Sequence, residues 1–440
     1  MSYSMHKLDV NVVNILTSFL EPRDIKALGT SCKHSYVQTR NFMTYSYEQY
    51  GDNDTYNTMR NVKWMIERYS DSVIQDCISR KLMIVNICFD PLFNQPIKAI
   101  PECKHLQYIT FGNTFNQSIN SLSHCSRLRR LTFGWGFNQS IEHLAECTNL
   151  KYIKFGSEFN RRIDALSYCS QLSEIIFGYS FNQSIEALSS CNNLERLVFG
   201  YKFNQTVHAL ADCVSLTQLV FDWNFNQSIQ PLSHCVLLEH LVFSYSFNQS
   251  VEALTNCTQL KNITFGHSFN HPVEFLSGCT NLKNITFGNY FDQSIEAIAN
   301  CTHLQDLTLG SRFNKSIKVL SNCIHLQQIR FGICFNKSID VLSNCIHLQQ
   351  IRFGTCFNKS IRALTKCTSI KYITFGDNFN QPVKFLSKCI HLIQIIFGKS
   401  FNHPTETLSH CRHRRHIDIQ SSDYIKHNRV SYRRLSLLSR

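Results

Sequence analysis

The sequence lacks any long apolar run. No stretch of the 440 residues approaches the roughly 18 consecutive apolar residues of a membrane-spanning helix. The N-terminal stretch MSYSMHKLDVNVVNIL also has no positive region followed by an apolar run of signal-peptide length. We therefore expect an intracellular protein, cytoplasmic or nuclear and without membrane contact. Its twenty cysteines would then be thiols unless they bind metal.

Catalytic motifs are lacking as well. The chain has no glycine-rich phosphate loop and no nucleophile in a G-x-S-x-G context. Cys-x-His recurs, for example at Cys323 and His325, but the paired C-x-x-C and H-x-x-x-H spacing of zinc modules does not. We expect no catalytic residue, no metal and no cofactor, so any chemistry would come from partners.

Charged residues are sparse, at 17% of the chain. Such a composition fits a repeat protein that buries much of every repeat. The net charge of +13 nevertheless raises the hypothesis of an acidic or nucleic-acid partner. The one dense basic patch is the tail from Arg412 to Arg440. A solvated tail is the simpler interpretation, and nucleic acid is the less favoured partner.

One repeat of 22 residues fills most of the chain. TFGNTFNQSINSLSHC (110–125) returns as TFGWGFNQSIEHLAEC (132–147). A Phe-Asn or Phe-Asp pair marks each of fifteen copies, which start at Phe93, Phe115, Phe137, Phe159, Phe181, Phe203, Phe225, Phe247, Phe269, Phe291, Phe313, Phe335, Phe357, Phe379 and Phe401. Because 22 residues cannot bury their own apolar face, each unit must stack on its neighbours.

Each copy predicts one coil of a solenoid. The consensus L-x-x-I-x-F-G-x-x-F-N-x-(S/P)-(I/V)-x-x-L-x-x-C-x-x gives a strand ended by Gly, a turn, and a second apolar ridge. The fold class is therefore an α/β repeat. The recurring Asn fits a ladder whose amides satisfy backbone groups at the turn, and Asp292 can supply only the accepting half. Asn-Gln-Ser also fits a glycan acceptor, but we favour the ladder.

Fifteen of the twenty cysteines, from Cys103 to Cys411, occupy one slot of the repeat. Free Cys packs as a small apolar residue, so buried thiols are the favoured interpretation. Disulfides between adjacent rungs are an alternative, because neighbouring coils are close enough. Metal binding is the third alternative.

The motif FNQPI (93–97), which returns as FNQPV (379–383), and the 22-residue unit resemble the FNIP repeat, a relative of the leucine-rich repeat. The resemblance covers roughly residues 82 to 416. It implies a leucine-rich-repeat-like solenoid of about fifteen repeats that binds protein and has no catalytic activity of its own.

Residues 8–36 lie outside the repeat and carry an apolar stripe at helical spacing, interrupted at Glu21 and Pro22. The segment resembles an F-box, and the alternative is a small helical cap. F-box plus FNIP repeats is an architecture of amoebae and of the giant viruses that infect them. The residues that the resemblance assigns to adaptor binding are Leu8, Leu16, Phe19, Leu20, Ile25 and Leu28.

We therefore expect a helical F-box-like domain at 1–45, a helical linker and cap at 46–83, an FNIP-repeat solenoid at 84–416 and a basic tail at 417–440. The resemblance implies the substrate-recognition subunit of a Skp–cullin–F-box ubiquitin ligase. The F-box would bind a Skp-type adaptor, and the solenoid would bind a target, a host protein if the chain is viral. The alternative is a protein-interaction scaffold outside any ligase.

Two sets of outward positions are candidates for target binding. The outward strand positions hold Tyr108, Arg130, Tyr152, Glu174, Arg196, Gln218 and His240, and we select Tyr108, Arg130, Tyr152 and Arg196 as target-binding residues. The positions after the strand Gly or its substitute are Trp135, Tyr179, Tyr201, Trp223 and Tyr245, which could form an aromatic strip along one rim. The alternative for the second set is that the rings only cover the edge of the coils.

Overall fold

The computed structural model describes residues 83–405, together with 45–46, 63–66, 75, 79, 408 and 416–419. The chain divides into two compact units, Met1–Leu216 and Thr217–Arg440, and each is a stack of coils. The six predicted adaptor-binding residues lie outside the described residues, so the F-box remains a prediction.

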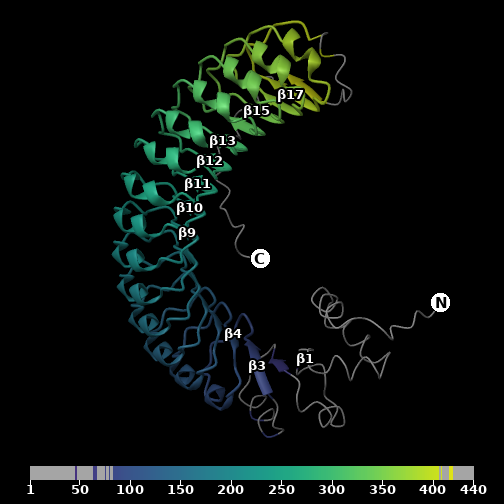
Figure 1. Ribbon diagram of the computed structural model, residues 1–440. Helices are drawn as coiled ribbons and strands as arrows, with labels where there is room; N and C mark the ends of the chain where they lie inside the picture. The colour runs from purple at the N-terminus through teal and green to yellow at the C-terminus, as the bar shows by residue number, and fades with distance from the viewer. Residues whose placement is uncertain are drawn as a thin grey trace, which may run out of the picture. The chain divides into compact units, whose positions relative to one another are not determined.

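Each coil begins with a short strand, and successive strands within a unit pair in parallel (Figure 1). The strands of the first unit are β1 (Tyr45–Ser46), β2 (Lys63–Ile66), β3 (Met83–Cys88), β4 (Tyr108–Thr110), β5 (Arg130–Thr132), β6 (Tyr152–Lys154), β7 (Glu174–Ile176) and β8 (Arg196–Val198). Those of the second are β9 (Gln218–Val220), β10 (His240–Val242), β11 (Asn262–Thr264), β12 (Asn284–Thr286), β13 (Asp306–Thr308), β14 (Gln328–Arg330), β15 (Gln350–Arg352), β16 (Tyr372–Thr374), β17 (Gln394–Phe397) and β18 (His416–Ile419). The predicted parallel-strand solenoid is confirmed in both units.

The strands expose two residues and bury one. In β4 the side chain of Ile109 is buried, whereas Tyr108 and Thr110 are exposed. Leu106 before the strand and Phe111 after it are also buried. This alternation is the period of a β-strand, and it places the flanking residues of every strand on one outward face.

The return arm of each coil is a 3-10 helix. In η3 (Asn120–His124) the Leu122 N–H donates to the Ile119 carbonyl at 2.9 Å, and the Cys125 N–H donates to the Leu122 carbonyl at 2.8 Å. Buried side chains recur every third residue, at Ile119, Leu122, Cys125 and Leu128, which matches the three residues per turn of a 3-10 helix. The α/β repeat is therefore corrected to a strand and 3-10 repeat within residues 83–405, because the arm is too short for α-helical turns.

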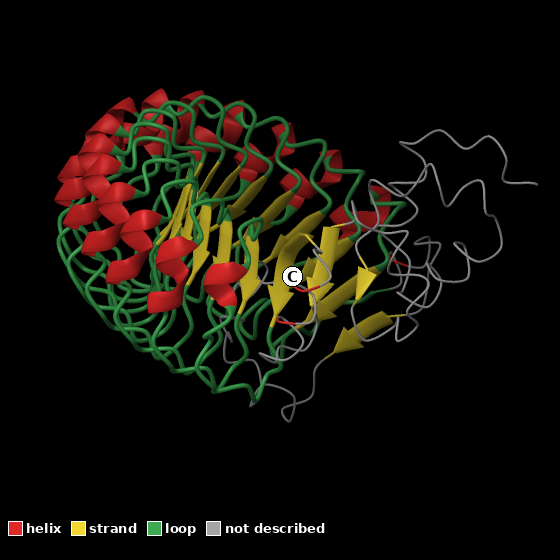
Figure 2. Cartoon of the chain, turned by 90° about the horizontal axis from the view of Figure 1, so that it is seen from below, coloured by secondary structure: helices red, strands yellow, loops and turns green. Residues whose placement is uncertain are grey.

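These arms lie on one side of the strands in each unit (Figure 2). Those of the first unit are η2 (Ile100–Glu102), η3, η4 (Glu142–Glu146), η5 (Asp164–Tyr168), η6 (Glu186–Ser190) and η7 (His208–Asp212). Those of the second are η8 (Gln230–His234), η9 (Glu252–Asn256), η10 (Glu274–Gly278), η11 (Glu296–Asn300), η12 (Lys318–Asn322), η13 (Asp340–Asn344), η14 (Arg362–Lys366) and η15 (Lys384–Lys388).

Two columns of phenylalanine rings fill the inside of the coils. The ring of Phe137 lies 3.8 Å from that of Phe133 in its own coil and 6.1 Å from that of Phe115 in the coil before, measured between centroids. Strands in a sheet are only about 4.8 Å apart. The coils are thus closer together at the strands than at the Phe-Asn turn, which curves each unit toward its strand face.

The asparagine ladder is present as predicted. The Asn116 backbone N–H donates to Oδ1 of Asn94 at 2.9 Å, and the Gln117 amide donates to the same oxygen at 3.2 Å. Asp292 keeps the ladder intact, because its carboxylate accepts the Asn314 N–H at 3.0 Å. Asn116 is exposed, so the hydrogen bond rather than burial defines its role.

We expect Asn270→Ala to lower the free energy of unfolding by about 1–2 kcal/mol, because the Asp292 N–H and the Gln293 amide both lose Oδ1 of Asn270. Asn270→Asp keeps the accepting oxygen and should cost less. Chemical denaturation of both variants checks this, and equal losses would contradict the acceptor role.

The cysteine ladder consists of buried free thiols at every described rung, Cys103 to Cys389. The Cys147 Sγ–H donates to the Leu122 carbonyl at 3.4 Å, and Cys169 does the same to Leu144. Burial raises the pKa of Cys147 to about 12, so the nucleophilic thiolate is suppressed. Buried thiols are therefore the correct interpretation for these rungs; Cys411 lies outside the described residues.

Both ends of the solenoid extend further than predicted. Lys63–Ile66, expected in a helical linker, forms β2 and pairs with β3, so the linker prediction is wrong there. At the other end β18 pairs with β17 at the same 22-residue spacing and includes residues 417–419, which were assigned to the tail. The edge strand of a sheet has unpaired backbone N–H and C=O groups, with which the next segment of the chain can pair.

Candidate protein-binding surfaces

The outward strand face of the first unit brings four predicted residues into one column. The pairing register aligns Tyr108, Arg130, Tyr152, Glu174 and Arg196 on successive strands. The Arg130 guanidinium lies over the Tyr152 ring at 3.8 Å from its centroid. Such cation–π contacts hold a long side chain in one position. The column is a mixed aromatic and charged surface, which is suited to contact with protein.

Arg196 and Glu174 form an ion pair that is largely shielded from solvent. The two side chains are 14% and 28% exposed. Among the described residues, Nη2 of Arg196 has no hydrogen-bond partner. A buried guanidinium N–H without an acceptor costs free energy. A hydrogen bond from this N–H to an acceptor on a bound partner would therefore stabilise the complex.

The same column in the second unit contains a polar ladder, of which only His240 was named as an outward position from the sequence. The Asn262 amide bonds to Nδ1 of His240 at 2.6 Å, and the amide of Asn284 lies against it in the next coil. With its amide nitrogen turned toward the next coil, Asn284 donates to Oδ2 of Asp306 at 2.8 Å. The register at 22-residue intervals was the signal that could have grouped these residues.

Asp306 ends that ladder with an unpaired carboxylate oxygen. Its Oδ1 is buried and has no hydrogen-bond partner among the described residues. Burial raises the pKa of Asp306, and the nearby Arg330 opposes the rise. The carboxyl group can thus accept a donor from a partner, or take up a proton more readily than a solvated Asp.

The predicted aromatic strip contains a stacked pair of rings in each unit. Tyr179 and Tyr201 stack at 4.7 Å in the first unit, and Trp223 and Tyr245 stack at 4.1 Å in the second. Trp135 has no ring partner among the described residues and is 61% exposed. Stacked rings cover one another, so Trp135 is the most solvent-accessible of the five candidates.

The second-unit stack extends beyond the predicted residues. His267 lies against Tyr245 at 4.4 Å and meets the Tyr290 ring edge-on at 4.9 Å. Arg312 then lies over Tyr290 at 4.1 Å. Burial lowers the pKa of His267, which favours the neutral ring in this stack. The strip had been sought only among Trp and Tyr, so His267 and Arg312 were not included.

In the described part of the chain, no group of three or more His, Cys, Asp or Glu residues is placed to hold a metal ion. Nor is any described helix long and apolar enough to cross a membrane.

Comparison with known proteins identifies the architecture. No protein-family model matches the sequence, and neither does any curated protein. A leucine-rich-repeat protein of Leptospira interrogans is similar in structure, with a TM-score of 0.67 and 10% identity, covering 84% of this chain and 98% of that one. The ectodomain of the receptor kinase GASSHO1/SCHENGEN3 from Arabidopsis thaliana, in complex with CASPARIAN STRIP INTEGRITY FACTOR 2, gives a TM-score of 0.57 at 16% identity, over 82% of this chain and 50% of that one.

A third solved structure is more similar in sequence. The circular leucine-rich-repeat protein CroV588 is 30% identical, with a TM-score of 0.60, over 78% of this chain. The match spans 51% of CroV588, about half its length. Together with the stacked parallel strands and short return arms, these similarities show that the described residues form a solenoid of the leucine-rich-repeat type.

Proposed function

We propose that the solenoid is a protein-binding scaffold. The observation that carries this proposal is the contrast between a constant interior and a variable exterior. Phe, Asn and Cys repeat in nearly every coil, whereas the outward strand positions change from Tyr108 to Arg130 and on along the column. A structural role requires only the interior, so the exterior variation fits recognition of a partner. The complexed plant receptor ectodomain is an example of a solenoid that holds a partner.

We further propose that the chain is the substrate-recognition subunit of a Skp–cullin–F-box ubiquitin ligase. The support is the F-box resemblance of residues 8–36 and its combination with FNIP-like repeats. In this arrangement the N-terminal segment binds the Skp-type adaptor, and the solenoid holds a target near the recruited conjugating enzyme. The contribution to ubiquitin transfer is positioning, since the bond-forming chemistry belongs to the partners.

The double variant Leu16→Asp, Leu20→Asp should abolish pull-down of a Skp-type adaptor, because each Asp puts a charge into the apolar face assigned to adaptor binding. A matched control is Leu92→Asp, Leu237→Asp, at two exposed leucines of the solenoid. The control should bind the adaptor normally. Retained binding by the first variant, with the solenoid folded in both, would refute the ligase assignment.

Trp135→Ala should affect target binding, whereas Trp223→Ala should affect stability. Trp135 is exposed and unstacked, so its loss should leave the thermal midpoint unchanged and weaken capture of the target. Trp223 stacks on Tyr245, so its loss should cost about 1 kcal/mol of stability. Thermal unfolding and target co-purification measure both effects. Unchanged capture with Trp135→Ala would remove this residue from the target-binding surface.

The second candidate function is a scaffold outside any ligase. The polar ladder from His240 to Asp306 and the aromatic stacks support protein binding without requiring an adaptor. Purification of target without any Skp-type or cullin partner would favour this function.

A further inference from the structure

One position of the repeat changes its chemistry in three consecutive coils of the second unit. This position follows the ladder Asn and is Gln in most coils, where the amide donates to the Asn oxygen of the coil before, as Gln293 does to Asn270 at 3.2 Å. Lysine replaces it at Lys315, Lys337 and Lys359. All three lysines are exposed. The coils here have exchanged a stabilising hydrogen bond for a positive charge.

These lysines have little compensation from the protein itself. Lys315 lies 3.4 Å from Oδ2 of Asp292, in an exposed ion pair. Among the described residues, Lys337 and Lys359 have no ion pair or side-chain hydrogen bond. At this turn the Phe313 and Phe335 rings of adjacent coils are 6.3 Å apart and the Phe335 and Phe357 rings 6.1 Å apart, so three like charges in a column repel one another. An external anion would relieve that repulsion.

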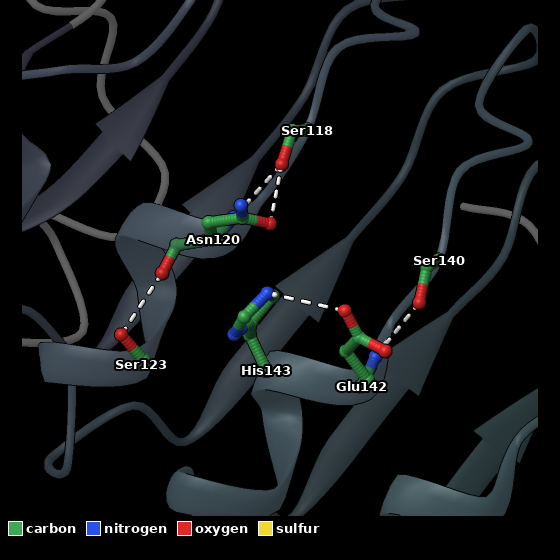
Figure 3. Close-up of polar contacts among 6 residues, drawn as sticks. All are labelled: Ser118, Asn120, Ser123, Ser140, Glu142 and His143. Carbon is green, nitrogen blue, oxygen red and sulfur yellow. Dashed lines mark hydrogen bonds and ion pairs between the residues drawn. The ribbon is translucent and has the colours of Figure 1, made fainter.

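A second column, three positions further along each repeat, also becomes mainly basic in these coils. In most coils the first residue of the 3-10 arm is exposed, and its backbone N–H donates to the hydroxyl of a Ser two positions earlier. Figure 3 shows this geometry in the first unit, where the Glu142 N–H donates to Ser140 Oγ at 3.3 Å. In the second unit the Lys318 N–H makes the same bond to Ser316, at 3.2 Å. Both columns therefore recur at the 22-residue spacing of the coils.

The first residues of the arms are acidic in three coils and mainly basic in the next four. Glu252, Glu274 and Glu296 begin η9, η10 and η11, whereas Lys318, Asp340, Arg362 and Lys384 begin η12 to η15. All seven are exposed. A hollow of about 640 Å³ opens at the basic end, lined by Lys315, Lys318, Lys337, Ser338 and Asp340.

We propose that this edge, defined by Lys315, Lys318, Lys337, Lys359 and Arg362 and named the basic edge, binds an acidic segment of a partner polypeptide. The lysine column runs across successive coils, so the segment lies extended along the edge. Carboxylates recur every second residue on one side of an extended chain, roughly 7 Å apart, and can each meet a cation. Assigning this partner as the ligase target rests on the proposed function.

The neighbouring glutamates distinguish a polypeptide from a nucleic acid. A phosphate backbone is negative throughout and would be repelled where the same edge continues to Glu296, Glu274 and Glu252. A polypeptide can be acidic over the basic edge and neutral or basic beyond it. No aromatic side chain lines the hollow, so bases would find no stacking platform there.

The test compares two full-length triple variants. Lys315→Gln, Lys337→Gln, Lys359→Gln installs the residue that other coils use, so folding should be retained and the thermal midpoint should not fall. Lys98→Gln, Lys104→Gln, Lys151→Gln removes the same charge from exposed lysines of the first unit. Fluorescence anisotropy measures binding of a labelled poly-L-glutamate peptide, and oligouridylate of equal length is the comparison probe.

The first variant should bind polyglutamate about tenfold more weakly than the unaltered chain, and salt should reduce the difference. The control should stay within about twofold. Equal losses in both variants, or no loss in the first, would overturn the proposal. So would tighter binding of oligouridylate that depends on the same three lysines. The assay contains no ligase component, so its failure is distinguishable from failure of adaptor binding.

Discussion

Replacing Phe265 by alanine should lower the free energy of unfolding of the second unit by about 4 kcal/mol. Phe265 is 1% exposed and lies 4.2 Å from the ring of Phe269 in its own coil. It also stacks on Phe287 at 5.4 Å and meets Phe275 edge-on at 6.4 Å. Because stacked coils cannot rearrange independently, the substitution should leave a cavity where the ring was. The loss of stability should extend to the coils on either side.

The control for this change is Phe265→Leu. Leu309 already occupies the equivalent slot in another coil and is buried there, so leucine should cost much less than alanine. Hydrogen exchange measured on peptides of individual coils can locate the effect. A loss for Phe265→Ala below about 1 kcal/mol would contradict a tightly packed ring column.

Gly288→Ala should destabilise the second unit by about 3 kcal/mol, although it adds only one methyl group. A Cβ at Gly288 would lie 1.6 Å from the carbonyl oxygen of Gly266 and 2.4 Å from its carbonyl carbon. Both atoms are backbone, so one coil would have to move away from the next. The strand Gly is thus required by close approach between coils.

Gly278→Ala is the matched control, because its added Cβ would meet nothing closer than 3.6 Å. It should be neutral or slightly stabilising. Equal thermal midpoints for Gly288→Ala and Gly278→Ala would contradict the close-approach argument.

The interior of the solenoid could be predicted from the sequence because every buried contact repeats at 22 residues. The Asn and Cys ladders follow from that period, since equivalent residues must meet in adjacent coils. The return arm was harder to predict. Apolar residues at three-residue spacing fit both an α-helical and a 3-10 face over so few residues, and the short arm decides for the latter.

The exterior could be predicted less well. Tyr108 and Arg130 were placed correctly in one outward column, because strand alternation fixes direction. The pairing of Arg196 with Glu174 and the ladder that ends at Asp306 depend on side-chain conformations that a periodic pattern does not contain. The basic edge was visible as Lys for Gln in three coils, but its meaning depends on the hydrogen bond that Gln makes.

The central claim is that one chain joins an adaptor-binding segment to a target-binding solenoid. Affinity purification with quantitative mass spectrometry tests it most directly, comparing the unaltered chain with Leu16→Asp, Leu20→Asp. We expect the Skp-type adaptor and the cullin to disappear from the variant, while a shared target remains at the same level in both. Skp-type and cullin partners that are missing from the unaltered chain, or that persist in the variant, would contradict the claim.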